Sequence, residues 1–362
     1  MNIIKNNEKF DLISKFGLNI NQTKILFSLQ RLIVRKDINS TKNIKRIDKE
    51  KWLNEWSESI FDYLYGLDSS QTRFFYSTDE IKKVVNEEIK KSPNNKTWYY
   101  IIILECTLFI PYMPMRKNKD NDKKYSKLKF TKQTEYIKEI VKEHSIINDG
   151  CVEKFEKVYS KTLSKLKGVK SKVIISIVSL LAIIALSTAL AAVFSGPIAV
   201  TIFGSQFSGL SGAALTSACL AAAGGGAIAA GGAGMMGGIV TIAGGGALLG
   251  LAGGGVVVGG INMLIATTPE ITLTQAAKLE VVLKEIILNA QKDVCFAQNV
   301  LSNYKEQINK LNSYIKDLEL KIKKDKKMIK SLKKSLEYME KAYKDANVFT
   351  SSFNIGLNNE KE

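Results

Sequence analysis

The sequence predicts an all-α protein: a helical bundle with a central charge-free, glycine-rich transmembrane hairpin and a long C-terminal coiled-coil helix. Three observations support this prediction. Apolar residues recur at helical spacing in the N-terminal part, residues 173–269 contain no Asp, Glu, Lys or Arg, and a heptad pattern follows that gap. The expected regions are an N-terminal helical domain (1–160), a polybasic segment (161–172), a membrane-inserting region (173–267), a coiled-coil helix (268–348) and a flexible tail (349–362).

The N-terminal region carries several helical patterns. The stretches "TKILFSLQRLIVRK" and "DKEKWLNEWSESIFDYLYGL" each place apolar residues on one helical face. The stretch "STDEIKKVVNEEIKK" begins with a capping box, in which Ser77 caps the helix and Glu80 reaches back to it. Two more helices are expected at "TKQTEYIKEIVKEH" and "CVEKFEKVYSKTLSKLKG", and "MRKNKDNDKKYSKLKF" is expected to form a charged loop.

One N-terminal stretch, "WYYIIILECTLFIPYMP", is apolar apart from Glu105. It is short for a bilayer span, which needs roughly 20 apolar residues. We therefore expect a helix buried in the core of the protein.

The charge-free region begins with a segment long enough to cross a bilayer. "VIISIVSLLAIIALSTALAAVF" covers residues 173–194, and its 22 residues would form a helix of about 33 Å. Lysines precede it directly and are predicted to contact anionic lipid on the cytoplasmic side. These lysines are Lys161, Lys165, Lys167, Lys170 and Lys172. The alternative is an ordinary solvated helix face, and no nucleic-acid partner is expected because no DNA-binding motif is visible.

Glycine dominates the second half of the region, with 17 glycines among residues 224–260. Each costs a helix about 1 kcal/mol relative to alanine, so close packing in lipid must compensate. Spacings of four place glycines on one helical face, a pattern also described as a glycine zipper. The residues predicted for insertion and helix packing are Gly234, Gly238, Gly246, Gly250, Gly254 and Gly259. The alternatives are a flexible linker and a buried core in a soluble protein; the buried core could coexist with later release.

The C-terminal region has a helix start at Thr268–Pro269 and a second capping box at Thr272 and Gln275. A heptad register then continues to Ala346 with Asp325 as its one polar interruption. The predicted seam includes Ile308, Leu311, Ile315, Leu318, Ile322, Ile329 and Leu332. An unbroken helix would be roughly 100 Å long. Alternatively the helix folds back on itself at "KIKKDKKM".

The sequence offers no pattern typical of an enzyme. The four cysteines lack a CxxC spacing and His144 is the single histidine, which argues against a zinc site or a disulfide framework. A GxGxxG string at Gly232, Gly234 and Gly237 lacks the following acidic residue that dinucleotide binding needs. We expect no catalytic residues, no cofactor and no metal. The N-terminus has no apolar core of signal-peptide length, so we expect synthesis in the cytoplasm.

Residues 208–250, "SGLSGAALTSACLAAAGGGAIAAGGAGMMGGIVTIAGGGALLG", resemble a Gly/Ala membrane region found in uncharacterised bacterial proteins. They are also loosely similar to the membrane regions of the apolipoprotein L family and of the eukaryotic transmembrane-and-coiled-coil-domain proteins. This resemblance is compositional and covers about a quarter of the chain. It implies a helical protein that enters membranes and permeabilises them, and it carries over no catalytic residue.

These observations predict a pore-forming or membrane-disrupting protein, for example a toxin or an antiviral (abortive-infection) effector of bacteria. It would be cytoplasmic when inactive and would lie in the cytoplasmic (inner) membrane when active. The expected partners are the lipid membrane, further copies of the chain in a homo-oligomer, and a regulatory protein. The alternatives are a constitutive membrane-anchored coiled-coil scaffold and a soluble interaction protein with an unusual core.

Overall fold

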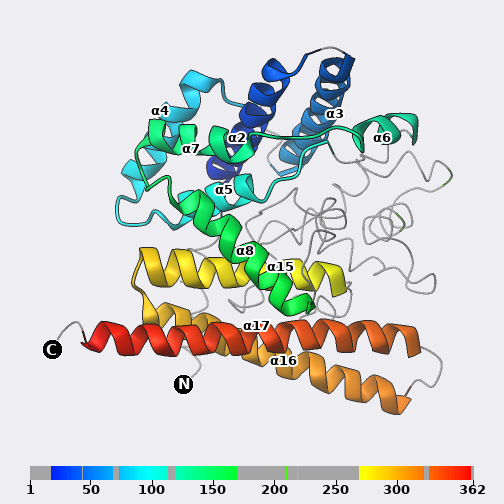
Figure 1. The fold of residues 1–362 in the computed structure, drawn as a ribbon, viewed down its shortest axis with the longest axis vertical. Helices are drawn as coiled ribbons and strands as arrows, with labels where there is room; N and C mark the ends of the chain where they lie inside the picture. Colours follow the sequence, from blue (N-terminus) through cyan, green and yellow to red (C-terminus); the bar gives the residue numbers. More distant parts are fainter. Residues whose placement is uncertain are drawn as a thin grey trace.

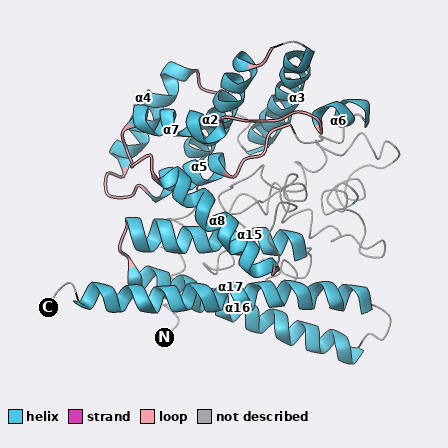
Figure 2. Ribbon diagram, viewed as in Figure 1, coloured by secondary structure: helices cyan, strands magenta, loops and turns pink. Residues whose placement is uncertain are grey.

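The computed structural model describes residues 18–42, 44–67, 73–112, 119–168, 269–321 and 326–359, together with Gly209 and Ala218. Throughout these ranges the regular structure is helical and no strand occurs, so the all-α prediction is confirmed (Figure 2). The helices are α2 (Ile20–Ser40), α3 (Ile44–Leu67), α4 (Thr78–Lys91), α5 (Thr97–Thr107), α6 (Lys119–Tyr125), α7 (Gln133–His144), α8 (Cys151–Lys167), α15 (Pro269–Val281), the π-helix η3 (Val282–Ala290), α16 (Val294–Lys321) and α17 (Lys326–Asn359).

Helix α2 is the centre of the N-terminal group and contacts α3, α4, α5 and α7. Its apolar residues recur every three or four positions, and both Ile25 and Ile33 are fully buried. On α3, Trp52 and Trp56 stack with their ring centroids 6.0 Å apart. The predicted capping box of α4 is present, because the backbone N–H of Ser77 donates to the Glu80 carboxylate at 2.8 Å.

The apolar N-terminal stretch forms α5, and every residue of this helix except Tyr100 is buried. The prediction of a buried core helix is therefore confirmed, although the helix is shorter than the stretch and ends before Pro111. The predicted charged loop that follows is wrong in part, because residues 119–125 form α6. Acidic residues in the first turn of α6 and lysines in its last turn favour this helix through the helix dipole.

A second group of helices comes from the C-terminal region and lies beside the first (Figure 1). Helix α8 runs between the two groups and crosses α15, against which it packs. Helix α15 also contacts α17, while α16 and α17 lie side by side and antiparallel. Helix α5 contacts α8 and η3, so the buried N-terminal helix reaches both groups.

The described residues of the C-terminal region do not form one unbroken helix, so that version of the prediction is wrong. The helix is interrupted after η3, where Lys292 has a φ of 59°. It ends again at Lys321 and resumes at Lys326, which agrees with the alternative of a fold-back at "KIKKDKKM". The described part of the helix begins at Pro269, and Thr272 lies inside it, so the second capping box marks no helix start.

The fold-back brings α16 and α17 of one chain into contact, and part of the predicted seam is buried. On α16, the seam residues Ile308, Leu311 and Ile315 are buried, and on α17 Leu332 is buried and Ile329 half-buried. Leu318 lies on α16, while Ile322 and Asp325 lie outside the described residues. Apolar residues of the predicted seam are thus removed from water on both α16 and α17.

The predicted membrane-inserting region lies outside the described residues, apart from Gly209 and Ala218. This applies to the span at 173–194, to all six packing glycines, and to Lys170 and Lys172. Among the helices that the structure does describe, none combines the length and the hydropathy that crossing a membrane requires.

A buried ion pair ties α2 to α3 in the N-terminal group. The Lys49 ammonium donates to the Asp37 carboxylate at 2.5 Å, and the Tyr112 hydroxyl donates to the same oxygen at 2.5 Å. Burial and the bond to Asp37 raise the pKa of Tyr112, so its hydroxyl stays protonated. Each of the three buried polar side chains therefore has a hydrogen-bond partner in the core.

We predict that Lys49→Met lowers the free energy of unfolding by about 3–5 kcal/mol, because it leaves the buried Asp37 side chain without its cationic partner. Tyr112→Phe removes one hydrogen bond to a charged group and should cost about 1.5–3 kcal/mol. Urea denaturation followed by circular dichroism measures both. Lys132→Met, which breaks an exposed pair with Glu135, is the matched control; an equal loss in the control would contradict the prediction.

Candidate functional site at the helices flanking the charge-free segment

The charge-free segment, residues 173–269, lies between α8 and α15 in the sequence, and these two helices pack directly against each other. Helix α15 has no solvent-exposed face over two turns, because every residue from Ala276 to Leu283 is buried. This run includes Lys278 and Glu280, two side chains that are rarely buried unless they are paired. Helix α15 can therefore be buried only if both charges have partners.

Lys278 pairs with Glu105, the single charge of the apolar helix α5. Its ammonium donates to the two carboxylate oxygens of Glu105 at 2.7 and 2.9 Å. The side chains are 8% and 4% exposed, so water screens this pair little. The pair joins residues 173 positions apart in the sequence and fastens α15 to the N-terminal group.

Four charged residues form what we call the ion cluster: Lys165 of α8, Glu280 of α15, Lys284 of η3 and Asp345 of α17. Lys284 donates to Glu280 at 2.5 Å and to Asp345 at 2.8 Å. Lys165 donates to the other Asp345 oxygen. The hydroxyl of Thr162, also on α8, donates to Glu280 at 3.3 Å. The ion cluster thereby connects the helix before the charge-free segment, the helix after it, and the long C-terminal helix.

The two carboxyl groups of the ion cluster have opposite pKa shifts. Burial and the neighbouring Asp345 raise the pKa of Glu280 to about 7, against the effect of Lys284. Burial would also raise the pKa of Asp345, but Glu280 and the ammonium groups of Lys165 and Lys284 together hold it well below its usual range. One carboxylate therefore remains charged throughout the neutral range, while Glu280 changes its protonation within it.

Polar atoms around Glu280 are incompletely satisfied. Among the residues that the structure describes, neither its buried Oε1 atom nor the buried hydroxyl of Tyr304 on α16 has a hydrogen-bond partner. Burial and the charge of Glu280 both raise the pKa of Tyr304. An ionised, fully buried carboxylate with one unsatisfied oxygen is costly, and this cost explains why Glu280 retains its proton up to near-neutral pH.

Lys284 lies on η3, a π-helix of nine residues between α15 and α16. Such segments are rare and are often found at functional positions. The apolar residues Leu283, Ile286 and Ile287 of η3 are fully buried. Lys284 is therefore held by packing on either side as well as by its two carboxylate partners.

The structure places three of the five predicted lipid-contacting lysines on α8. Lys161 is exposed, Lys167 is half-buried, and Lys165 is exposed yet paired with Asp345. Exposed Lys154 and Lys157 extend the basic face toward the start of the helix. Lys165 is thus the one predicted site residue that the structure brings into the ion cluster.

Sequence reasoning missed the other members of the ion cluster and the Lys278–Glu105 pair. The available signal was the string "AAKLEVVLKEIIL" (276–288), in which isolated charges interrupt an otherwise apolar run. A run of this kind indicates buried charges that need partners. The identity of the partners, Glu105 and Asp345, depends on the tertiary fold alone.

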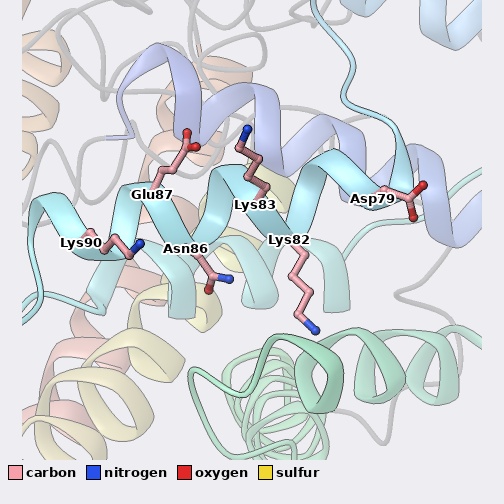
Figure 3. Close-up of a pocket in the computed structure, with 6 residues that line it drawn as sticks. All are labelled: Asp79, Lys82, Lys83, Asn86, Glu87 and Lys90. Atoms are coloured by element: carbon pink, nitrogen blue, oxygen red, sulfur yellow. The ribbon is translucent and has the colours of Figure 1, made fainter.

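The surface groove on α4 and the groove between α16 and α17 indicate no specific ligand. One, of about 440 Å³, is bordered on α4 by Asp79, Lys82, Lys83, Asn86, Glu87 and Lys90 (Figure 3). These side chains carry both signs of charge and fan out along one helix instead of converging. The other groove, of about 510 Å³, lies between α16 and α17 and is lined by Leu301, Tyr343 and polar side chains. In the described part of the chain, no His, Cys, Asp or Glu side chains gather in a metal-binding arrangement.

Comparisons of the chain with protein-family models, with curated proteins and with solved structures gave no match. The resemblance of residues 208–250 to membrane regions of other families therefore stays a prediction.

We predict that Glu105→Gln and Lys278→Met each lower the free energy of unfolding by about 3–5 kcal/mol, because each leaves one buried charge without a partner. The double variant should lose less than the sum of the two, since it leaves no unpaired charge. A thermodynamic cycle from urea denaturation tests this. Additive losses would show that the two side chains do not interact in solution.

We predict that Glu280→Gln stabilises the protein above pH 7. The folded pKa of Glu280, about 7, lies above its ordinary value of 4.5, so its contribution to stability is greatest below about pH 4.5 and is lost as the pH rises to 7. Glutamine stays neutral at every pH, and Lys284 keeps its pair with Asp345. The expected gain is about 1–3 kcal/mol at pH 8 and should vanish near pH 5.

Thermal unfolding of the wild type and Glu280→Gln between pH 5 and 8.5 measures this difference. Glu285→Gln, on the adjacent π-helix η3 and only half-buried, is the control and should show no pH-dependent gain. A Glu280→Gln variant less stable than the wild type at pH 8 would mean that the ionised carboxylate stabilises the ion cluster.

Proposed function

We propose that this is a membrane-inserting protein of the pore-forming or membrane-disrupting kind, in which the described helices hold the charge-free segment until it enters the cytoplasmic membrane. One observation carries the proposal. A stretch of 97 residues without a charged side chain lies between two helices, α8 and α15. These helices are joined by the hydrogen bond from Thr162 to Glu280 and, through Lys284 and Asp345, by the ion cluster. A segment of this composition suits a lipid environment, because no helix within it has a charged face for water.

Fastening through ions supports a holding role that can be reversed. Apolar packing responds little to pH or to nearby charge, whereas removing or neutralising one partner of a buried ion pair destabilises the fold by about 3–5 kcal/mol. Lys165 belongs to the ion cluster but is 58% exposed, so a negatively charged membrane surface can compete with Asp345 for it. Loss of this contact would loosen α8 from α17.

The sequence supports the later steps of the proposal. The lysines before residue 173 would stay with the anionic headgroups, and the glycine spacing would allow close packing between helices of several copies. The antiparallel pair α16–α17 would act as the coiled coil that clamps or oligomerises the protein. A membrane disruptor made in the cytoplasm would suit a toxin or an antiviral defence effector that arrests its own cell.

A second function, a constitutive membrane-anchored scaffold, is favoured by the surface of α16 and α17. Leu320, Val348 and Ile355 are apolar and exposed on these helices. Exposed apolar side chains bind a partner protein where they form part of a contiguous patch. Overproduction separates the two functions: a disruptor is toxic, and deletion of residues 173–267 removes the toxicity, whereas a scaffold is tolerated and remains in membranes throughout.

We predict that the full-length protein releases dye from vesicles that contain anionic lipid. Replacing Gly246, Gly250 and Gly254 with leucine should reduce release, because the larger side chains prevent close helix packing. Glu105→Gln should accelerate release, because it unfastens α15 from α5. Fluorescence of an encapsulated dye measures both rates.

The control is Glu319→Gln, which breaks an exposed pair between α16 and α17 and should leave the release rate unchanged. Unchanged release by the leucine variant would argue against packing through the glycine stripe. Absence of release by the wild type at every lipid composition and pH tested would overturn the proposed function itself.

A further inference from the structure

The first turn of α3 exposes two apolar side chains. Ile44 is 74% and Ile47 is 64% exposed, and their spacing of three places them on one side of the helix. Later in the same helix, Trp52 and Trp56 turn inward and are buried. The two isoleucines are therefore not needed for the core, although an exposed isoleucine is unfavourable in water.

Cationic side chains surround these isoleucines. Lys42, Lys45 and Arg46 are exposed, and neither Lys42 nor Lys45 has an ion-pair partner within the described ranges. Arg46 pairs with Glu50 at 2.9 Å, and both side chains of that pair remain about half exposed. Positions 42–47 contain no acidic residue. The outward side of this turn is thus both basic and apolar.

The inward side of the same turn is occupied. Lys49 turns into the core to pair with Asp37, and Asp48 is half-buried and close enough to contribute to the raised pKa of Tyr125. The acidic residue next to the isoleucines therefore faces the protein, and the positive charge faces away from it.

The turn lies at an edge of the molecule. Figure 1 shows the connection between α2 and α3 at the top of the view, with α16 and α17 at the opposite side. A flat surface can therefore reach this turn without meeting the C-terminal helices.

We propose that Lys42, Ile44, Lys45, Arg46 and Ile47, which we call the α3 patch, dock the protein on an anionic lipid surface. The isoleucines enter the boundary between headgroups and acyl chains, and the three cations contact headgroup phosphates. This occupant matches both features of the α3 patch: a nucleic acid would satisfy the cations and leave the isoleucines in water, and an apolar protein groove would leave the cations unused.

Docking through the α3 patch goes beyond the proposed function. It uses residues remote in sequence from the charge-free segment, and it requires neither insertion of that segment nor opening of the ion cluster. A weak basic patch combined with a few apolar side chains gives reversible attachment, which is suited to a first encounter with the membrane.

The test measures binding of the full-length protein to vesicles by co-sedimentation, at concentrations where no dye is released. The vesicles are made of phosphatidylcholine alone or with an equal amount of phosphatidylglycerol. We expect the double variants Ile44→Ser with Ile47→Ser, and Lys42→Glu with Lys45→Glu, each to bind the anionic vesicles roughly tenfold more weakly. The lysine variant should also lose most of its sensitivity to salt.

Matched controls carry the same changes on other exposed positions. Lys82→Glu with Lys83→Glu alters the charge equally on α4, and Ile355→Ser removes an exposed isoleucine from α17. Both should bind like the wild type. Unchanged thermal unfolding of all variants, expected for exposed positions, shows that they are folded.

Three results would overturn the proposal: wild-type affinity in the α3 variants, equal binding of the wild type to both kinds of vesicle, or tighter binding to single-stranded RNA than to anionic vesicles. The outcome is independent of the proposed function. Vesicle binding through the α3 patch, with no dye released at any protein concentration, would refute membrane disruption alone. Wild-type vesicle binding by the α3 variants, together with normal dye release at higher concentration, would refute docking through the α3 patch alone.

Discussion

Pairing of buried charges on α15 is the constraint on which the arrangement of the two helical groups depends. Lys278 and Glu280 lie in a run that is buried on every side, so each must find a partner on another helix. Lys278 pairs with Glu105 of the N-terminal group. Glu280 accepts from Lys284, which also donates to Asp345 of the C-terminal group. Helix α15 therefore contacts both groups. Helix α8 joins the same contacts, because Thr162 donates to Glu280 and Lys165 donates to Asp345.

The contacts of the N-terminal group differ from those of the ion cluster in how they respond to pH and to nearby charge. The N-terminal group is held together by apolar packing around Trp52 and Trp56 and by the buried Lys49–Asp37 ion pair. The Tyr112 hydroxyl donates a further hydrogen bond to Asp37. The ion cluster instead includes an exposed lysine, a carboxyl group that titrates near neutral pH and an unsatisfied buried oxygen. Such groups respond to pH and to nearby charge, which is why we place the reversible step there.

The proposed function and the α3 patch describe different encounters with lipid. The α3 patch would bring the protein to an anionic surface through exposed residues that have no role in the core. The same surface would then compete for Lys165 at the start of the charge-free segment. Both steps use positive charge from the N-terminal 172 residues, which hold 35 basic and 22 acidic residues and thus most of the net charge of +17.

The sequence alone determined the fold class, the buried character of α5, the capping box of α4 and the extent of the charge-free segment. These features follow from periodicity, capping chemistry and composition, which act locally along the chain. Only the tertiary structure decided that the heptad region folds back on itself, that residues 119–125 form a helix, and that Lys278 and Glu280 meet Glu105, Lys284 and Asp345. The partners Glu105 and Asp345 are more than 60 residues away from α15, and local patterns carry no information on which distant helix satisfies a buried charge.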